Sequence, residues 1–138
     1  MGERAGEPGP QRVVDVPGLS DSRRWGYAHV VTAGDLIFVA GQAGQDEEGR
    51  IVSLEFEVQA RRTFENIERA LSSVGAEVPD LVAMTSFITD WRYAPTLSDV
   101  RKEFLGENLV TDALVGVSQL ALPEMLIEVQ SVAVRPGA

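Results

Sequence analysis

The sequence predicts an α+β fold, in which a single mixed β-sheet carries two helices packed on one of its faces. The chain has 138 residues, of which 44% are hydrophobic and 24% charged, as is typical of one soluble globular domain. Segments with the hydrophobic period of a strand alternate with segments that have the period of a helix, and no internal sequence repeat is visible. We therefore expect one core between a sheet and its helices.

The first two strands are expected at residues 28–32 and 36–41, as a β-hairpin. Gly34 lies between them and can adopt the positive φ angle that a tight turn requires. The run 36–40 is apolar at every position, so this strand presents apolar side chains on both faces. We therefore expect helices to cover one face of the sheet and another subunit to cover the other.

Two segments have the hydrophobic period of a helix. In residues 56–74 apolar side chains recur every three or four positions, and Gly75 is the expected stop, which predicts a helix of about 20 residues. In the shorter second helix, Pro95 suits the first turn and Gly106 the end.

Three further strands are expected at residues 81–89, 114–120 and 126–134. At the start of the chain, five of the first ten residues are glycine or proline, a composition that favours a flexible tail. We therefore expect a tail over residues 1–11 and one domain over residues 12–138.

The composition disfavours several classes of protein. There is no cysteine and a single histidine, so disulfides, thiolate catalysis and a metal site are not expected. The net charge of −9 opposes binding to nucleic acids and to anionic membranes. The longest apolar run is far shorter than the roughly 20 residues of a membrane span, and the first ten residues lack the apolar core of a secretory signal. We expect a cytoplasmic protein with no nucleic-acid or membrane partner.

Glu128 is the polar residue with the most informative setting, because it interrupts the apolar strand LIEVQSVAV. A carboxylate there either faces solvent or lies in a pocket that raises its pKa, and a raised pKa suits a general acid or base. Tyr27 and His29 lead into the first hairpin, and Gln42 follows it. A packing or structural role is the simpler expectation for Tyr27 and His29, with proton transfer as the alternative.

Four stretches together resemble the RidA/YjgF family. They are GYAHVVTAGDLIFVAGQAG with the turn DEEGRIV, the helix QARRTFENIERALSSVGA, the strand end FITD, and the closing LPEMLIEVQSVAV. The opening hairpin of that family reads close to PYSQAV, a glycine turn and LVFVSGQ. The resemblance covers about residues 12–134, and the order and spacing of these stretches are specific for the family.

The resemblance implies a chorismate-mutase-like homotrimer, in which the sheets pack into a barrel and small-molecule sites lie in the clefts between subunits. The best-known family activity is hydrolysis of reactive 2-imino acids or their enamines to 2-keto acids and ammonia, without a cofactor. By position, Glu128 matches the glutamate that orients the attacking water, Tyr27 the tyrosine at the pocket entrance, and Gly41 the backbone that contacts the substrate. Gln42 is a further candidate for substrate binding.

One feature of the family is missing from this sequence. Family deaminases carry an arginine in a PARS or PART stretch, where its planar fork binds the substrate carboxylate, and the matching stretch here reads VTDALVGV. The arginine position falls on Asp112, or on Leu114 if the gap is placed differently. Asp112 would repel a carboxylate by about 1 to 4 kcal/mol, so poor hydrolysis of 2-imino acids is expected. It could instead bind an amine-bearing part of a substrate.

Arg92 could supply a displaced cation, because the matching family residue lines the same cleft. The alternative is a surface arginine paired with Asp90 or Asp99. Trp91, which precedes Arg92, favours a larger and flatter ligand than a short-chain imino acid.

Three functions are compatible with these observations. The first is an arginine-lacking, RidA-like enzyme that acts on an imine, an enamine or a related electrophile by water and proton transfer, as a tailoring step in a dedicated or secondary metabolic pathway. The second is a non-catalytic trimer that binds a metabolite or a partner protein through the same clefts. The third is an endoribonuclease, which the charge of −9 disfavours.

Overall fold

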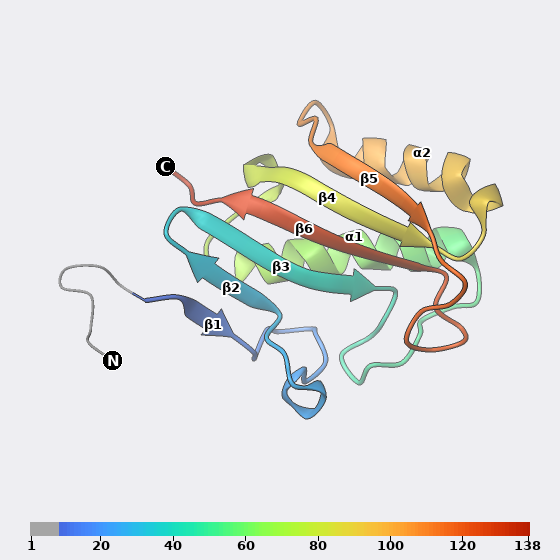
Figure 1. Cartoon of the computed structure of the whole chain (residues 1–138), viewed down its shortest axis with the longest axis horizontal. Coiled ribbons are helices and arrows are strands. Elements are labelled where there is room, and N and C mark those ends of the chain that lie inside the picture. Colours follow the sequence, from blue (N-terminus) through green and yellow to red (C-terminus); the bar gives the residue numbers. More distant parts are fainter. Residues whose placement is uncertain (1–8) are drawn as a thin grey trace.

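The computed structural model describes residues 9–138, and within them a mixed six-stranded sheet carries two α-helices on one face (Figure 1). The strand order is β1-β2-β3-β6-β4-β5, and every neighbouring pair is antiparallel except β4 and β5. The predicted α+β class is confirmed. The elements are β1 (Gln11–Val13), β2 (Val30–Ala33), β3 (Leu36–Ala43), α1 (Phe56–Ser72), β4 (Leu81–Ile88), α2 (Ala94–Leu105), β5 (Thr111–Gly116) and β6 (Ile127–Val134), with 3-10 helices η1 (Arg23–Trp25), η2 (Val78–Asp80) and η3 (Trp91–Tyr93).

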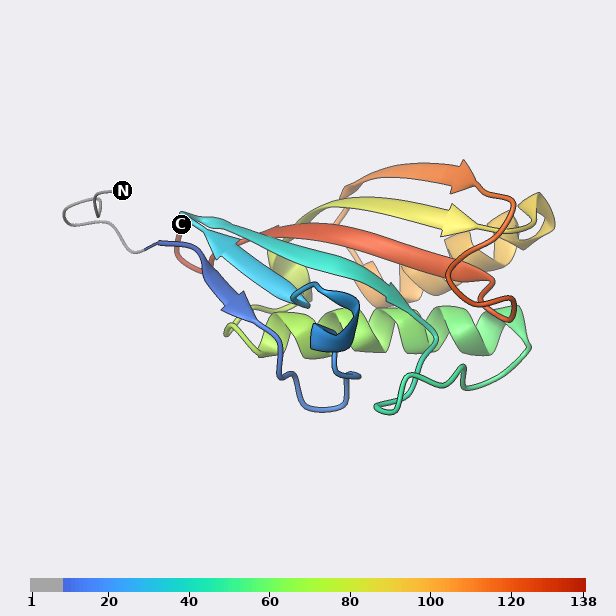
Figure 2. The ribbon, with the colours of Figure 1, turned by 60° about the horizontal axis from the view of Figure 1, so that its bottom comes forward.

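The helical period of the sequence places the core between α1 and the sheet (Figure 2). Phe64 and Leu71 of α1 expose 2% and 0% of their surface. The helix has 17 residues and ends two residues before the predicted end, and Gly75 then adopts a φ of 76°. Phe64 also stacks on Phe104 of α2, with ring centroids 4.8 Å apart, so the two helices pack against each other. Among the described residues, no helix is long and apolar enough to cross a membrane.

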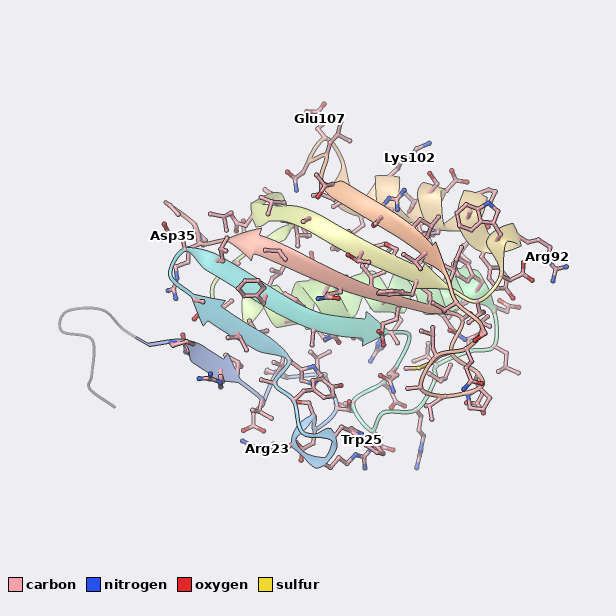
Figure 3. The ribbon with its side chains drawn as sticks, viewed as in Figure 1. Arg23, Trp25, Asp35, Arg92, Lys102 and Glu107 are labelled. Atoms are coloured by element: carbon pink, nitrogen blue, oxygen red, sulfur yellow. The ribbon has the colours of Figure 1, made fainter. Side chains whose placement is uncertain are left out.

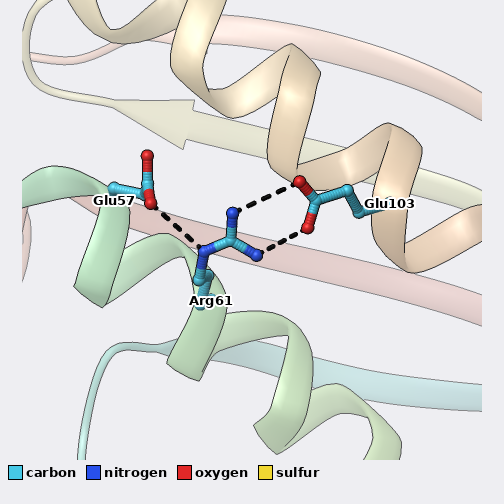
Figure 4. Close-up of polar contacts among 3 residues, drawn as sticks. All are labelled: Glu57, Arg61 and Glu103. Atoms are coloured by element: carbon cyan, nitrogen blue, oxygen red, sulfur yellow. Dashed lines mark hydrogen bonds and ion pairs between the residues drawn. The ribbon is translucent and has the colours of Figure 1, made fainter.

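The outer surfaces of the two helices are joined by an ion-pair network (Figure 4). Arg61 Nη1 of α1 lies 2.7 Å from Glu103 Oε2 of α2, and Arg61 Nε lies 3.3 Å from Glu57 Oε2 one turn earlier. These side chains are largely in contact with water, so the network stabilises the helix pair only weakly.

Two strands differ from the expectation. The sequence does not predict β1, because three residues at a sheet edge show no strand period; it begins at Gln11, the last residue of the predicted tail, and residues 1–8 lie outside the described part. β5 occupies Thr111–Gly116 in place of 114–120. It pairs in parallel with β4, and this pairing stops where β4 ends, at Ile88.

A β-bulge interrupts the pairing of β3 with β6. Val39 lies opposite Ser131 and Gln42 lies opposite Val129. β3 therefore advances three residues (39 to 42) over a stretch in which β6 advances two (131 to 129). The extra residue re-aims the chain locally, and Gly41 lies within this bulge.

The sheet face opposite the helices is called the open face below, because no α-helix of the described residues covers it (Figure 2). Strand alternation and register place there a set of apolar side chains: Val31, Leu36, Phe38, Phe87, Val115 and Val132. Leu36 and Phe38 each expose 42% of their surface. Contact of these apolar side chains with water is unfavourable.

Candidate functional site

Glu128 of β6 lies on the open face, between the buried residues Ile127 and Val129. Its side chain is partly buried, and no donor from residues 9–138 hydrogen-bonds to its carboxylate. Burial without a compensating donor raises the pKa of Glu128 above its ordinary value. The carboxyl group is therefore able to exchange a proton closer to neutral pH than a solvated glutamate.

The carboxyl group of Glu128 packs against the backbone of Gly41. A Cβ atom added at Gly41 would lie 2.7 Å from both Cδ and Oε2 of Glu128. Only glycine leaves room for this contact, so the β3 bulge and the carboxylate of β6 define one wall of the candidate site together.

Tyr27 lies beside this pair, in the segment that leads into β2. Burial, and after it the negative charge of Glu128, raises the pKa of the Tyr27 hydroxyl. The phenol therefore stays protonated near Glu128 and can donate a hydrogen bond to a ligand. The structure thus brings together Tyr27, Gly41 and Glu128, the three residues that the family resemblance assigns to the site.

His29 and Gln42 support this group from the buried side. His29 Nε2 donates to the carbonyl oxygen of Ser20 at 2.7 Å, and Gln42 Nε2 lies 3.2 Å from His29 Nδ1 and 3.2 Å from the Ala40 carbonyl oxygen. The Tyr27 ring meets the His29 ring edge-on, with centroids 5.8 Å apart. Gln42 lies opposite the buried Val129, so it holds the bulge and is not on the face where a substrate would contact Glu128.

Asp112 and Leu114 lie on the helix-covered face, which corrects their expected place in the site. They pair with Met84 and Ser86 of β4, both buried under the helices. Asp112 Oδ1 accepts a hydrogen bond from Ser86 Oγ at 2.9 Å, and Oδ2 lies 2.7 Å from Arg101 Nη1 of α2. The charge of Asp112 is therefore satisfied by Arg101 and Ser86 at the edge of the sheet, on the opposite side of the sheet from Glu128.

Arg92 and Trp91 lie at the end of the molecule, in η3. Arg92 exposes 87% of its side chain and pairs with Asp90, with Nη2 2.6 Å from Oδ2 (Figure 3). The hydrogen bonds from Arg92 lower the pKa of Asp90. Arg92 is thus the surface arginine of the alternative interpretation, paired with Asp90. Trp91 is 63% exposed and lies near Gly116 of β5.

The open face holds site neighbours that sequence reasoning missed. Phe87 of β4 lies opposite Glu128, and Val115 of β5 lies opposite Phe87, so the three side chains form one row across the sheet. Ala113 occupies the same face one row further along β5. The signal that could have identified them is the parallel register of β4 and β5, which periodicity alone does not supply.

Comparison with known proteins identifies the family to which this chain belongs. The family model described as Endoribonuclease L-PSP matches residues 22–135. A RutC family protein of Pyrococcus abyssi is 34% identical over 108 residues, which are 78% of this chain and 84% of the relative. This chain belongs to the RidA/YjgF family.

Two further RidA/YjgF relatives match over almost the whole chain. A Dermatophagoides farinae protein named 2-iminobutanoate/2-iminopropanoate deaminase is 26% identical over 126 residues, which are 91% of this chain and 97% of the relative. The solved structure of a YjgF/YER057c/UK114 family member from Mycobacterium tuberculosis matches with a TM-score of 0.78 and 26% sequence identity. The match covers 91% of this chain and 98% of the chain in that structure.

Asp112→Asn should destabilise this RidA/YjgF domain, because Arg101 would lose its ionic partner in a setting where only 23% of its side chain and 14% of that of Asp112 are exposed. We expect a loss of about 1–3 kcal/mol in the free energy of unfolding, measured by urea denaturation. The control Glu48→Gln breaks the exposed pair with Arg50 and should cost less than about 0.5 kcal/mol. Equal costs at the two sites would contradict a stabilising contact of Asp112 with Arg101 on the helix-covered face.

Glu128→Gln should stabilise the folded protein at neutral pH. Because the pKa of Glu128 is raised on folding, the contribution of its protonated form is complete below the unfolded pKa and is lost as the pH rises through the folded pKa. The variant should therefore melt at a higher temperature than the wild type at pH 7 and show no advantage near pH 3.5. Glu68→Gln, on the exposed side of α1, changes the net charge equally and serves as the control. A gain that is the same at both pH values would contradict the burial argument.

Proposed function

We propose that this RidA/YjgF protein is a hydrolase that acts on an imine, an enamine or a related electrophile by water and proton transfer. The observation that carries the proposal is the partly buried Glu128 carboxyl, which has a raised pKa, no hydrogen-bond donor among residues 9–138 and a close contact with Gly41. Relatives named as 2-iminobutanoate/2-iminopropanoate deaminases support this reaction type.

The proposed reaction converts an imine and one water molecule into the corresponding carbonyl compound and ammonia. Glu128 takes a proton from the water while the water oxygen attacks the imine carbon, and the C=N electron pair moves to nitrogen, which receives this proton from Glu128. Glu128 then takes the hydroxyl proton of the resulting carbinolamine and passes it to nitrogen as the C–N bond breaks, so the carbonyl compound forms and nitrogen leaves as ammonia. Tyr27 donates a hydrogen bond at the entrance of the site. No electrons are exchanged with an outside group, so the chemistry requires no cofactor.

A non-catalytic binding role and an endoribonuclease role are the competing functions. A pure binding module does not need a carboxyl group held with a raised pKa beside a backbone wall. An endoribonuclease needs a surface that attracts phosphates, and the net charge of −9 opposes this. The enzyme hypothesis gives a role to the burial of Glu128 and to its contact with Gly41, and the other two leave them without a role.

We also propose that the protein is a homotrimer whose substrate sites lie in the clefts between subunits. The apolar side chains of the open face, with Leu36 and Phe38 each 42% exposed, supply a surface that association would bury. Glu128 lies on this same face, so a neighbouring subunit would complete the enclosure of the site.

Light scattering at micromolar concentration should give about three times the mass of one chain. Phe38→Asp should lower this mass, because a charge on the open face opposes association. Val58→Asp places the same charge on a residue of α1 that is 40% exposed and should leave the mass unchanged. A monomeric wild type would refute the proposed assembly.

Catalysis is tested with imines that flavin-dependent amine and amino acid oxidases release in situ, with semicarbazide as a competing trap. The wild type should divert imine from the trap to carbonyl product. Glu128→Gln should lower this rate by about 10²- to 10⁴-fold, the usual contribution of a general acid or base. Gly41→Ala should also lower it, because the new Cβ displaces the carboxyl group.

The control for Gly41→Ala is Gly116→Ala in β5, where the nearest atom to an added Cβ is 4.0 Å away. It should keep the wild-type rate. Full activity of Glu128→Gln would refute the proposed role of the carboxyl group, and specific binding of an imine analogue without any turnover would favour the binding module.

A further inference from the structure

The neighbours directly across from Glu128 on the open face are apolar. Phe87 lies opposite it on β4 and Val115 follows in the same row on β5. On the other side, Ala43 of β3 lies opposite Glu128, and Gly41 packs on its carboxyl group. The side chains directly across from Glu128 are therefore hydrocarbon, and the polar groups nearest to it, Gln130 and Thr85 one row further along the sheet, are uncharged.

The cations on or next to the sheet strands are engaged elsewhere or lie at a distance along the sheet, and the Arg24 guanidinium of η1 lies over the Trp25 ring, 5.3 Å from its centroid. The four strands β3, β6, β4 and β5 contain no lysine or arginine. Arg12 lies on β1, which β2 and β3 separate from β6. Arg101 is held by Asp112 on the opposite face, and Arg92 is held by Asp90. Arg135, just beyond β6, donates to the Gly34 carbonyl oxygen at the far end of that strand from Glu128.

A carboxylate on the substrate would meet an unfavourable field in these surroundings. It would lose its water without gaining a positive partner from β3, β6, β4 or β5, and it would lie near the negative charge of Glu128. A cation at this place would also stabilise ionised Glu128 and lower its pKa, whereas burial raises it. An uncharged ligand avoids the repulsion and buries its apolar part against Phe87 and Val115.

Resting on the proposed function, we infer that the site is selective for imines or enamines that carry no carboxylate and whose flanking group is apolar. The apolar row of Phe87 and Val115 binds that group, and Glu128 is the single charged side chain at the reacting position. The substrate-supplying reaction must then be one that leaves an uncharged imine, such as oxidation of an amine.

The test compares two imines that differ by a methyl group in place of a carboxylate. A flavin-dependent amine oxidase releases 1-phenylethanimine from α-methylbenzylamine, and an amino acid oxidase releases 2-imino-2-phenylacetate from phenylglycine. Hydrolysis gives acetophenone or phenylglyoxylate with ammonia. Semicarbazide again traps the imine that the protein has not hydrolysed, and the trapped product is measured. We expect the wild type to prefer 1-phenylethanimine by at least tenfold in kcat/KM.

Variants on β5 separate charge from shape. Val115→Arg should raise the rate with 2-imino-2-phenylacetate by at least tenfold and lower the rate with 1-phenylethanimine, because it adds a cation to the row of Glu128. Val115→Met introduces a long side chain without a charge and should not raise the rate with 2-imino-2-phenylacetate. Ala113→Arg, on the same face one row further, provides a second cationic variant if Val115→Arg does not fold.

Each outcome has a definite meaning. Equal or faster hydrolysis of 2-imino-2-phenylacetate by the wild type overturns the inference and leaves the proposed hydrolase function intact. Failure to accelerate hydrolysis of either imine overturns the proposed function and the inference with it. A preference for the uncharged imine that Val115→Arg reverses and Val115→Met does not supports both.

Discussion

The contact between the Glu128 carboxyl group and the backbone of Gly41 is the constraint on which the rest of the site depends. The bulge in β3 brings Gly41 to β6, and any larger residue there would overlap the carboxyl group. From the buried side, Gln42 and His29 hydrogen-bond to each other and tie the bulge to the segment before β2. One irregularity in one strand thus sets the position of the backbone wall, the carboxyl group and the nearby phenol.

The two faces of the sheet treat charge in opposite ways. On the helix-covered face, Asp112 is paired with Arg101 and accepts a further hydrogen bond from Ser86. Its carboxylate is therefore fully engaged and is not available for proton transfer. On the open face, Glu128 is desolvated without a partner from the described residues, and this raises its pKa. A partnered carboxylate stabilises packing, and an unpartnered one retains the ability to transfer a proton.

The sequence predicts the elements whose hydrophobic period is long, such as the helix around Phe64 and the strand that contains Glu128, because burial of one face leaves a regular mark. It does not predict the face on which Asp112 lies. A shift of one residue in register moves a side chain to the opposite face. The strand expected at 114–120 lies at Thr111–Gly116 in the structure, so Asp112 falls outside the expected strand. The pairing of Asp112 with Arg101 depends on how α2 packs under β5, and neither propensity nor spacing encodes this.

The proposed assembly and the proposed chemistry are coupled through the open face, because its exposed apolar side chains lie on the same surface as Glu128. In the proposed trimer, a neighbouring subunit removes further water from this face. The ionised form of Glu128 loses hydration while the protonated form is hardly affected, so association shifts its pKa upward from a value that burial within one chain already raises. The same exclusion of water strengthens the hydrogen bond that Tyr27 can offer to a ligand, since electrostatic interactions grow as the local dielectric falls. The isolated chain therefore holds the groups of the site in place, and association would give them the dry surroundings in which a glutamate transfers protons near neutral pH.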